Sequence, residues 1–101
     1  MGQAENNITK RIKDYLKSKD IWHVKYFANA FTAVGIPDIL ACVRGRFVGI
    51  EVKTEVGKLS KMQEFQGEKI CQSGGYWFCV RPSTFEDFKS AIEMLLEARD
   101  G

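Results

Sequence analysis

Two short apolar runs with a glycine turn between them constrain the fold of this chain more than any other feature. The runs cover residues 35–40 and 47–53, and Arg44-Gly45-Arg46 separates them. Apolar runs of this length predict β-strands, and the short segment between them predicts an antiparallel hairpin. With the turn centred near Gly45, residue 39 is expected opposite residue 51, within one position. Asp38 and Glu51 are therefore predicted to be cross-strand neighbours, with Cβ atoms roughly 5–8 Å apart.

The second strand of this hairpin has one polar and one apolar face. Successive side chains of a strand point to opposite faces, so Glu51 and Lys53 share a face with Gly49. The other face is expected to enter a core and carries Val48, Ile50 and Val52. Two close carboxylates repel each other, and the pKa of one rises unless a cation lies between them. Mg²⁺ binds to one or two protein carboxylates, and an adjacent lysine suits a phosphodiester.

Four sequence blocks in order carry a family resemblance over nearly the whole chain. They are Gly35-Ile36-Pro37-Asp38, Glu51-Val52-Lys53-Thr54, Gly57-Lys58-Leu59-Ser60 and Gln63. Pro37-Asp38 followed by Glu51-Val52-Lys53 resembles the PD-(D/E)XK pattern of restriction-endonuclease-like nucleases. The four blocks together resemble the VRR-NUC domain (virus-type replication-repair nuclease) in its stand-alone form. The resemblance implies a DNA endonuclease that depends on Mg²⁺ or Mn²⁺ and hydrolyses phosphodiester bonds.

The resemblance also implies roles for individual residues. The catalytic residues would be Asp38, Glu51, Lys53 and Gln63. The metal ligands would be Glu5, Asp38, Glu51 and the carbonyl of Val52. Glu5 has a second interpretation, because an acidic residue in the first turn of a helix is favoured by the helix dipole.

Gln63 also has two interpretations. Ser60 and Gln63 have the spacing of a capping box, in which the glutamine side chain accepts from the N–H at the start of the helix. The resemblance instead places Gln63 at the edge of the active site. The sequence predicts that one side chain does not perform both roles fully.

Basic residues gather in the first two thirds of the chain, although the net charge is only +2. A basic surface of this kind favours nucleic-acid binding, and the alternative is an ordinary solvated surface. The predicted DNA contacts near the hairpin are Lys25, Arg44, Arg46, Lys58 and Lys61. Asn29 and Phe31 are further candidates, because they lie in a loop that leads into the hairpin.

The remaining pattern predicts the order α-β-β-β-α-β-α in one α/β domain over residues 1–101. Helices are expected over 5–18, from Ser60, and after a capping box of Ser83 and Glu86. Strands are expected over 21–27, in the hairpin, and over 76–80, the last being central or nearly so because it is wholly apolar. Met62, Phe65 and Ile70 are expected to pack the second helix on a mixed sheet. This order is that of a restriction-endonuclease-like core with one added helix.

Length and composition limit the remaining possibilities. No apolar run approaches a membrane span, and the N-terminus has no signal-peptide pattern. The three cysteines form no metal-binding or disulfide pattern and are expected to be buried, which fits an intracellular, cytoplasmic protein of bacterial or phage origin.

With 101 residues the chain offers little surface to DNA, so a homodimer is expected. The resemblance implies branched DNA as the substrate, because free-standing relatives resemble Holliday-junction resolvases. The final helices are the expected source of the dimer interface. The alternatives are a flap- or end-processing nuclease, a catalytically idle DNA-binding accessory module, and a structural domain in which Asp38, Glu51 and Lys53 form ion pairs. A replication or repair partner protein is compatible with the small size, but no docking motif is present.

Overall fold

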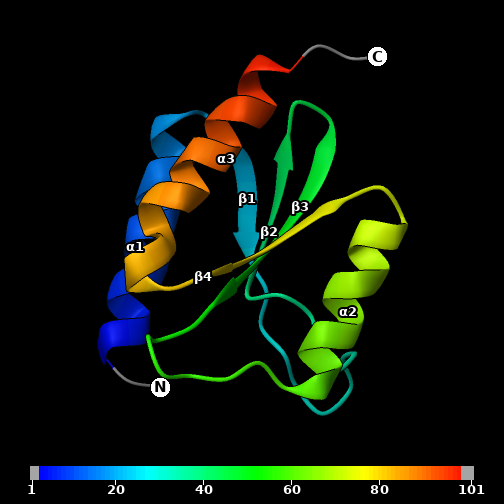
Figure 1. Cartoon of the computed structure of the whole chain (residues 1–101). Helices are drawn as coiled ribbons and strands as arrows, with labels where there is room; N and C mark the ends of the chain where they lie inside the picture. Colours follow the sequence, from blue (N-terminus) through cyan, green and yellow to red (C-terminus); the bar gives the residue numbers. More distant parts are fainter. Residues whose placement is uncertain (1–2, 99–101) are drawn as a thin grey trace.

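The fold follows the predicted order of helices and strands (Figure 1). The structure is a computed structural model that describes residues 3–98. The elements are α1 (Gln3–Ser18), β1 (Trp22–Lys25), β2 (Ile39–Val43), β3 (Arg46–Val52), α2 (Lys61–Gln72), β4 (Tyr76–Val80), a 3₁₀ turn (Pro82–Thr84) and α3 (Phe85–Glu97). The predicted α/β class and element order are confirmed, and β1 is shorter than the expected strand over 21–27.

The predicted hairpin consists of β2 and β3, joined by a two-residue turn. Arg44 and Gly45 have φ angles of 50° and 83°, and positive φ at both central positions is typical of a type I′ turn. Ile39 pairs with Ile50 in the register, so Asp38 lies where the next pair, opposite Glu51, would form. This register is within the one-position range that the sequence predicts.

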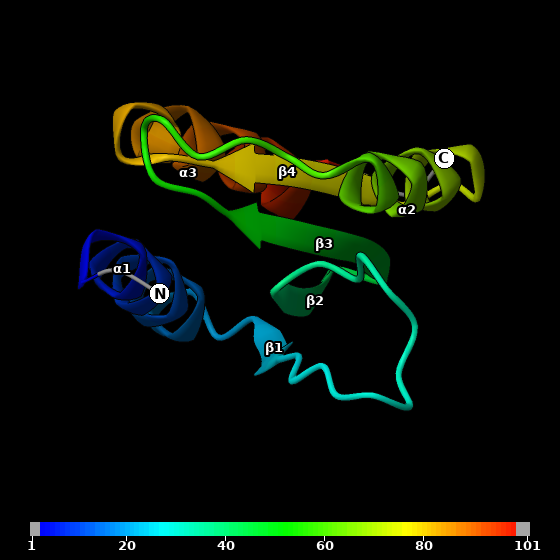
Figure 2. The ribbon, with the colours of Figure 1, turned by 90° about the horizontal axis from the view of Figure 1, so that it is seen from below.

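The sheet is mixed, with the strands in the order β1-β2-β3-β4. The first three strands are antiparallel, and α2 provides the crossover that makes β4 parallel to β3. Figure 2 shows α1 and α3 on one face of the sheet and α2 on the other. Val48, Ile50 and Val52 join α1 and α3 in one buried core. The opposite face of β3, with Gly49 and Glu51, therefore points toward α2, as the alternation predicts.

The prediction that β4 is a central strand is wrong, because β4 forms an edge of the sheet. Its apolar sequence has another cause: α2 and α3 both pack against it from opposite faces. A strand that is covered on both faces reads as a continuous apolar run even at an edge.

The packing of α2 also differs from the expectation. Met62 and Phe65 are 41% and 50% exposed, whereas the small Gly67 is the buried residue of this helix. Ile70 packs on the sheet as expected, because its Cδ1 lies 3.1 Å from an ideal Cβ position on Gly49. The helix therefore approaches the sheet through Gly67 and Ile70 and not through Met62 or Phe65.

Ser83 does not form the predicted capping box with Glu86. Its N–H and its hydroxyl donate instead to the Glu55 carboxylate, at 2.6 and 2.8 Å. α3 begins directly after the 3₁₀ turn, and its N-cap residue Thr84 makes no side-chain cap. A contact with a residue 28 positions away has replaced the local one.

The expected burial of the cysteines is wrong for two of the three. Cys42 and Cys71 are exposed free thiols, and Cys79 is half-buried. Across residues 3–98, no helix has the length and apolar character needed to span a membrane.

Candidate active site

Asp38 and Glu51 meet at the open end of the hairpin, opposite its turn. Asp38 immediately precedes β2, and its backbone carbonyl accepts from Tyr26 N–H at 2.8 Å. Its side-chain Oδ2 accepts from Val52 N–H, also at 2.8 Å. The carboxylate of Asp38 is thus fixed against the strand that carries Glu51. The predicted proximity of the two acidic residues is confirmed.

Glu51 is a fully buried carboxyl group with 0% exposure. Its pKa is raised to about 8, first by burial and next by the negative charge of Asp38. The Lys53 ammonium and the Trp77 indole N–H act in the opposite direction. Oε2 of Glu51 has no hydrogen-bond partner among the described residues. A buried carboxyl beside a second acidic side chain is the kind of site that a cation stabilises.

Lys53 lies two residues after Glu51 on the same face of the chain. Its N–H donates to Val80 carbonyl at 3.0 Å, which continues the pairing of β3 with β4. Its Cδ lies 3.6 Å from an ideal Cβ position on Gly57, so the stem of the lysine passes over this glycine. Lys53 is therefore half-buried at its stem, with its charge acting on Glu51.

Arg81, which follows β4, hydrogen-bonds to the connection between β3 and α2. Its Nη1 donates to the carbonyls of Thr54 and Gly57, both at 2.6 Å. The same short segment carries the stem of Lys53, so Arg81 stabilises the support of this lysine. The sequence analysis did not identify Arg81, because only the tertiary fold brings it to residues 54–57.

The side chain of Gln63 lies both in the capping box and beside Glu51, as its two interpretations require. Its Oε1 accepts from Ser60 N–H at 2.8 Å, and its own N–H donates to Ser60 Oγ at 3.1 Å, which completes the predicted capping box. Its Nε2 lies 3.4 Å from Glu51 Oε1 and donates to it. The expectation that one side chain does not serve both places is wrong, because the two ends of the amide act separately.

Close backbone contacts bring the sequence blocks together. Gly35 has a φ of 83°, and a Cβ there would lie 2.5 Å from the Met62 carbonyl carbon, so residue 35 must be glycine. A Cβ on Gly49 would lie 2.9 Å from Pro37 Cγ. The segment that ends in Asp38 is therefore packed directly on β3 and on the start of α2.

Glu5 lies in the first turn of α1, where it is half-buried. Over residues 3–98, no three His, Cys, Asp or Glu side chains lie close enough together to hold a metal ion. Glu5 is therefore not brought together with Asp38 and Glu51 in this structure, and its role as a ligand stays a prediction. Val52 lies at the site and donates its N–H to Asp38, while a role for its carbonyl stays a prediction.

The predicted DNA contacts fall at two ends of the hairpin. Exposed Lys58 and Lys61 belong to the connection and to the start of α2, next to Gln63. Arg44 and Arg46 lie at the turn, roughly 17 Å from Glu51 at ~3.3 Å per residue of strand. Arg46 also donates to Leu95 carbonyl on α3. Lys25 lies over the Phe27 ring, 5.2 Å from its centre.

A cleft of about 370 Å³ opens beside Asp38 and Gln63. Its other walls are the loop from Ala28 to Ile36 and the side of Ser60. Asn29 shapes this loop, because its Oδ1 accepts from Phe31 N–H at 2.8 Å. Phe31 itself is 98% exposed. The loop that lines this cleft thus presents an aromatic side chain to solvent.

Comparison of the chain with models of protein families, with curated proteins and with solved structures gives no match. The resemblance to the VRR-NUC family and the roles that it implies therefore stay predictions, and the geometry of the site is what supports them.

Proposed function

We propose that this protein is a metal-dependent DNA endonuclease that hydrolyses phosphodiester bonds. One observation carries the proposal: the fully buried Glu51 carboxyl, with an unpartnered Oε2, lies beside Asp38 and within the field of Lys53. A purely structural ion-pair network would pair both acidic oxygens with cations. Burial without such pairing costs several kcal/mol and is typical of functional sites.

The acidic pair fits a divalent cation of the Mg²⁺ or Mn²⁺ type. These hard ions prefer oxygen ligands and commonly use one or two carboxylates, with water and phosphate oxygens as the other ligands. When bound, the ion would polarise the phosphate and lower the pKa of a water ligand. Asp38 and Glu51 would hold the ion, and the carbonyl of Val52 and the carboxylate of Glu5 are the further proposed ligands.

The chain's own residues would carry out the remaining work. The Lys53 ammonium would hold a phosphate oxygen and stabilise the negative charge that develops there. Gln63 would keep Glu51 in one orientation through its Nε2. Lys58 and Lys61 would contact neighbouring phosphates, and Lys25, Arg44 and Arg46 would extend this contact along the DNA.

Branched DNA is the proposed substrate, with the protein acting as a homodimer. Two sites related by a two-fold axis would cut two strands of a junction, and the doubled surface would suit DNA recognition. A groove of about 380 Å³ between β4 and α3 supports a second copy as its occupant. It is apolar and contains the 72% exposed Met94. The groove also lies against the edge strand β4, and an uncovered edge is a common site of association.

The decisive experiment compares cleavage of labelled four-way-junction, flap and linear duplex DNA in Mg²⁺, Mn²⁺ or EDTA. The matched variant is Lys53→Ala, which removes the ammonium without opening the core. Metal-dependent paired cuts in the junction that disappear in the variant are expected. Cuts in flaps or linear ends alone would support the proposed metal-dependent hydrolysis but would show that branched DNA is not the substrate. Binding without cleavage under every metal would leave an accessory DNA-binding module and overturn the enzyme assignment.

The dimer has a separate test that does not depend on cleavage. The mass in solution at micromolar concentration is expected to be that of two chains. Met94→Lys places a charge in the apolar groove and is expected to give folded monomers, whose melting temperature no longer depends on protein concentration. Phe65→Lys, at a 50% exposed position on α2, is the matched control and should remain dimeric. A monomeric wild-type protein would overturn the homodimer.

A further inference from the structure

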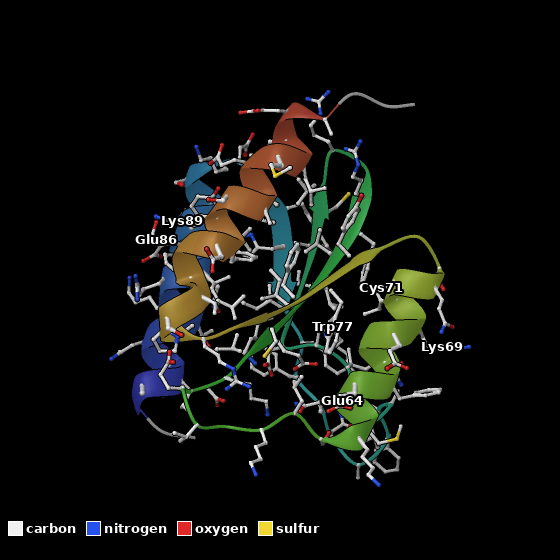
Figure 3. All side chains as sticks on the ribbon, viewed as in Figure 1. Glu64, Lys69, Cys71, Trp77, Glu86 and Lys89 are labelled. Atoms are coloured by element: carbon white, nitrogen blue, oxygen red, sulfur yellow. The ribbon has the colours of Figure 1, made fainter. Side chains whose placement is uncertain are left out.

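Trp77 lies on the same face of the sheet as Glu51. Gly49 pairs with Trp77 and Glu51 pairs with Cys79 in the parallel register of β3 and β4. Because residues 49 and 51 share a face, so do their neighbours on β4. Figure 3 shows Trp77 between the sheet and α2. Its indole is therefore a direct neighbour of the acidic pair, although no motif in the sequence pointed to it.

Gly67 fixes the place of this indole. A Cβ at residue 67 would lie 2.1 Å from Cδ2 of Trp77 and 2.3 Å from Cε2, distances that no side chain tolerates. A glycine in a helix interior destabilises the helix relative to alanine. The close approach to Trp77 is the structural reason for this glycine, so the helix and the ring form one rigid contact.

Two buried polar atoms on the α2 face of the sheet lack hydrogen-bond partners within residues 3–98. They are Nε1 of Trp77 and Oε2 of Glu51, one a donor and the other an acceptor. The indole N–H is close enough to Glu51 to lower the pKa of its carboxyl, although the two atoms do not meet the geometry of a hydrogen bond. A buried donor and a buried acceptor that stay unpaired each destabilise the folded state, and such atoms call for an explanation.

We propose that Trp77 is a positioning residue for Glu51, whose indole N–H donates to Oε2 when the site holds its divalent ion. Gln63 already donates to Oε1, so the two donors would hold the carboxylate from both ends. Each carboxylate oxygen accepts more than one partner, so both remain available to the ion. This inference rests on the proposed function, because it assumes that Glu51 is a metal ligand.

Trp77→Phe tests the role of the N–H, because phenylalanine keeps an aromatic ring against Gly67. Donors that orient a metal ligand typically change metal affinity 10- to 100-fold. The Mn²⁺ dissociation constant and the Mg²⁺ concentration that half-saturates cleavage are both expected to rise by this factor. The cleavage rate at saturating metal should stay close to that of the wild type. Trp22→Phe, at a 63% exposed position on β1, is the matched control and should change neither quantity.

A spectroscopic measurement does not depend on activity. The chain has two tryptophans, so Trp22→Phe leaves Trp77 as the sole fluorophore. Added Mg²⁺ is expected to shift the emission of Trp77, and the Mg²⁺ concentration at half of the full shift should equal the dissociation constant. If Trp77→Phe does not fold, this titration decides the question alone.

The outcomes separate this inference from the proposed function. A wild type that binds Mn²⁺ and cleaves DNA, with equal metal affinity in a folded Trp77→Phe variant, would overturn the role of Trp77 only. Mn²⁺ binding without any shift in the Trp77 emission would do the same. A wild type that neither binds metal nor cleaves would overturn both.

Discussion

The side-chain amide of Gln63 joins the start of α2 to Glu51. Its Oε1 is occupied by Ser60 N–H at 2.8 Å, and this leaves its Nε2 directed at Glu51 Oε1, 3.4 Å away. The cap decides which end of the amide faces the acidic pair, since a backbone N–H requires an acceptor. The helix cap therefore sets the hydrogen bond to the site.

This arrangement predicts that capping and activity separate in Gln63→Glu. Glutamate also serves as the third-position acceptor of a capping box, so the cap should be kept, and any loss of stability should come from the second carboxylate oxygen that faces Glu51. The donor to Glu51 is lost, and cleavage should fall at least tenfold. Ser60→Ala is the reverse case: it should cost about 1 kcal/mol and leave cleavage near the wild-type rate. Urea unfolding and cleavage rates measure the two effects, and equal losses of activity in both variants would contradict the separation.

The buried carboxyl of Glu51 predicts an unusual pH dependence of stability in EDTA. Its pKa is about 8 in the folded protein and about 4.5 in the unfolded chain. Between these values the folded state binds more protons, so the free energy of unfolding should fall as the pH rises from about 5 to 8, and then level off. Melting temperatures across this range measure the effect.

Mg²⁺ and a matched variant give the controls for this pH dependence. Because the ion favours the ionised carboxylate, Mg²⁺ should raise the melting temperature more at pH 8 than at pH 5.5. Glu51→Gln cannot ionise and should flatten the profile, which makes it more stable than the wild type at pH 8 in EDTA. A wild-type profile that rises toward pH 8 without metal would show that Glu51 is not held in its neutral form.

Local signals account for the parts that the sequence predicts well. The turn at Arg44 and Gly45 and the cap at Ser60 are decided by a few neighbouring residues, and both form as expected. The alternation along β3 correctly places Glu51 opposite the core, because a strand has a fixed period of two.

Contacts between distant segments account for what the sequence analysis missed. Ser83 binds to Glu55 in place of its local partner Glu86, since the fold brings a free carboxylate to its N–H. Trp77 and Gly67 belong to different elements, and neither residue alone indicates their contact. The sequence therefore predicted the acidic pair of the site but not the residues that support it.

The contact of Arg81 with the β3–α2 connection predicts a loss of both stability and activity. Arg81→Met removes the charged donor to the carbonyls of Thr54 and Gly57, and hydrogen bonds to charged groups contribute about 1.5–3 kcal/mol. The segment that supports Lys53 should loosen, so cleavage should fall even under conditions where the variant is fully folded. Chemical denaturation and the cleavage rate well below the melting temperature measure the two effects. Glu55→Ala breaks an exposed contact of the same connection and should have a smaller effect on stability than Arg81→Met.

The position of each basic residue predicts how much it contributes to DNA binding. Lys58→Gln, Lys61→Gln and Arg44→Gln each remove one positive charge, so they lower the net charge of +2 equally. A lost phosphate contact reduces the slope of log affinity against log salt by about 0.9. This reduction is expected for Lys58 and Lys61, beside the acidic pair, and a smaller one for Arg44 at the far turn. Binding of junction DNA across a salt series in Ca²⁺, without cleavage, measures the slopes. Equal reductions in all three would mean that the DNA follows the whole length of the hairpin.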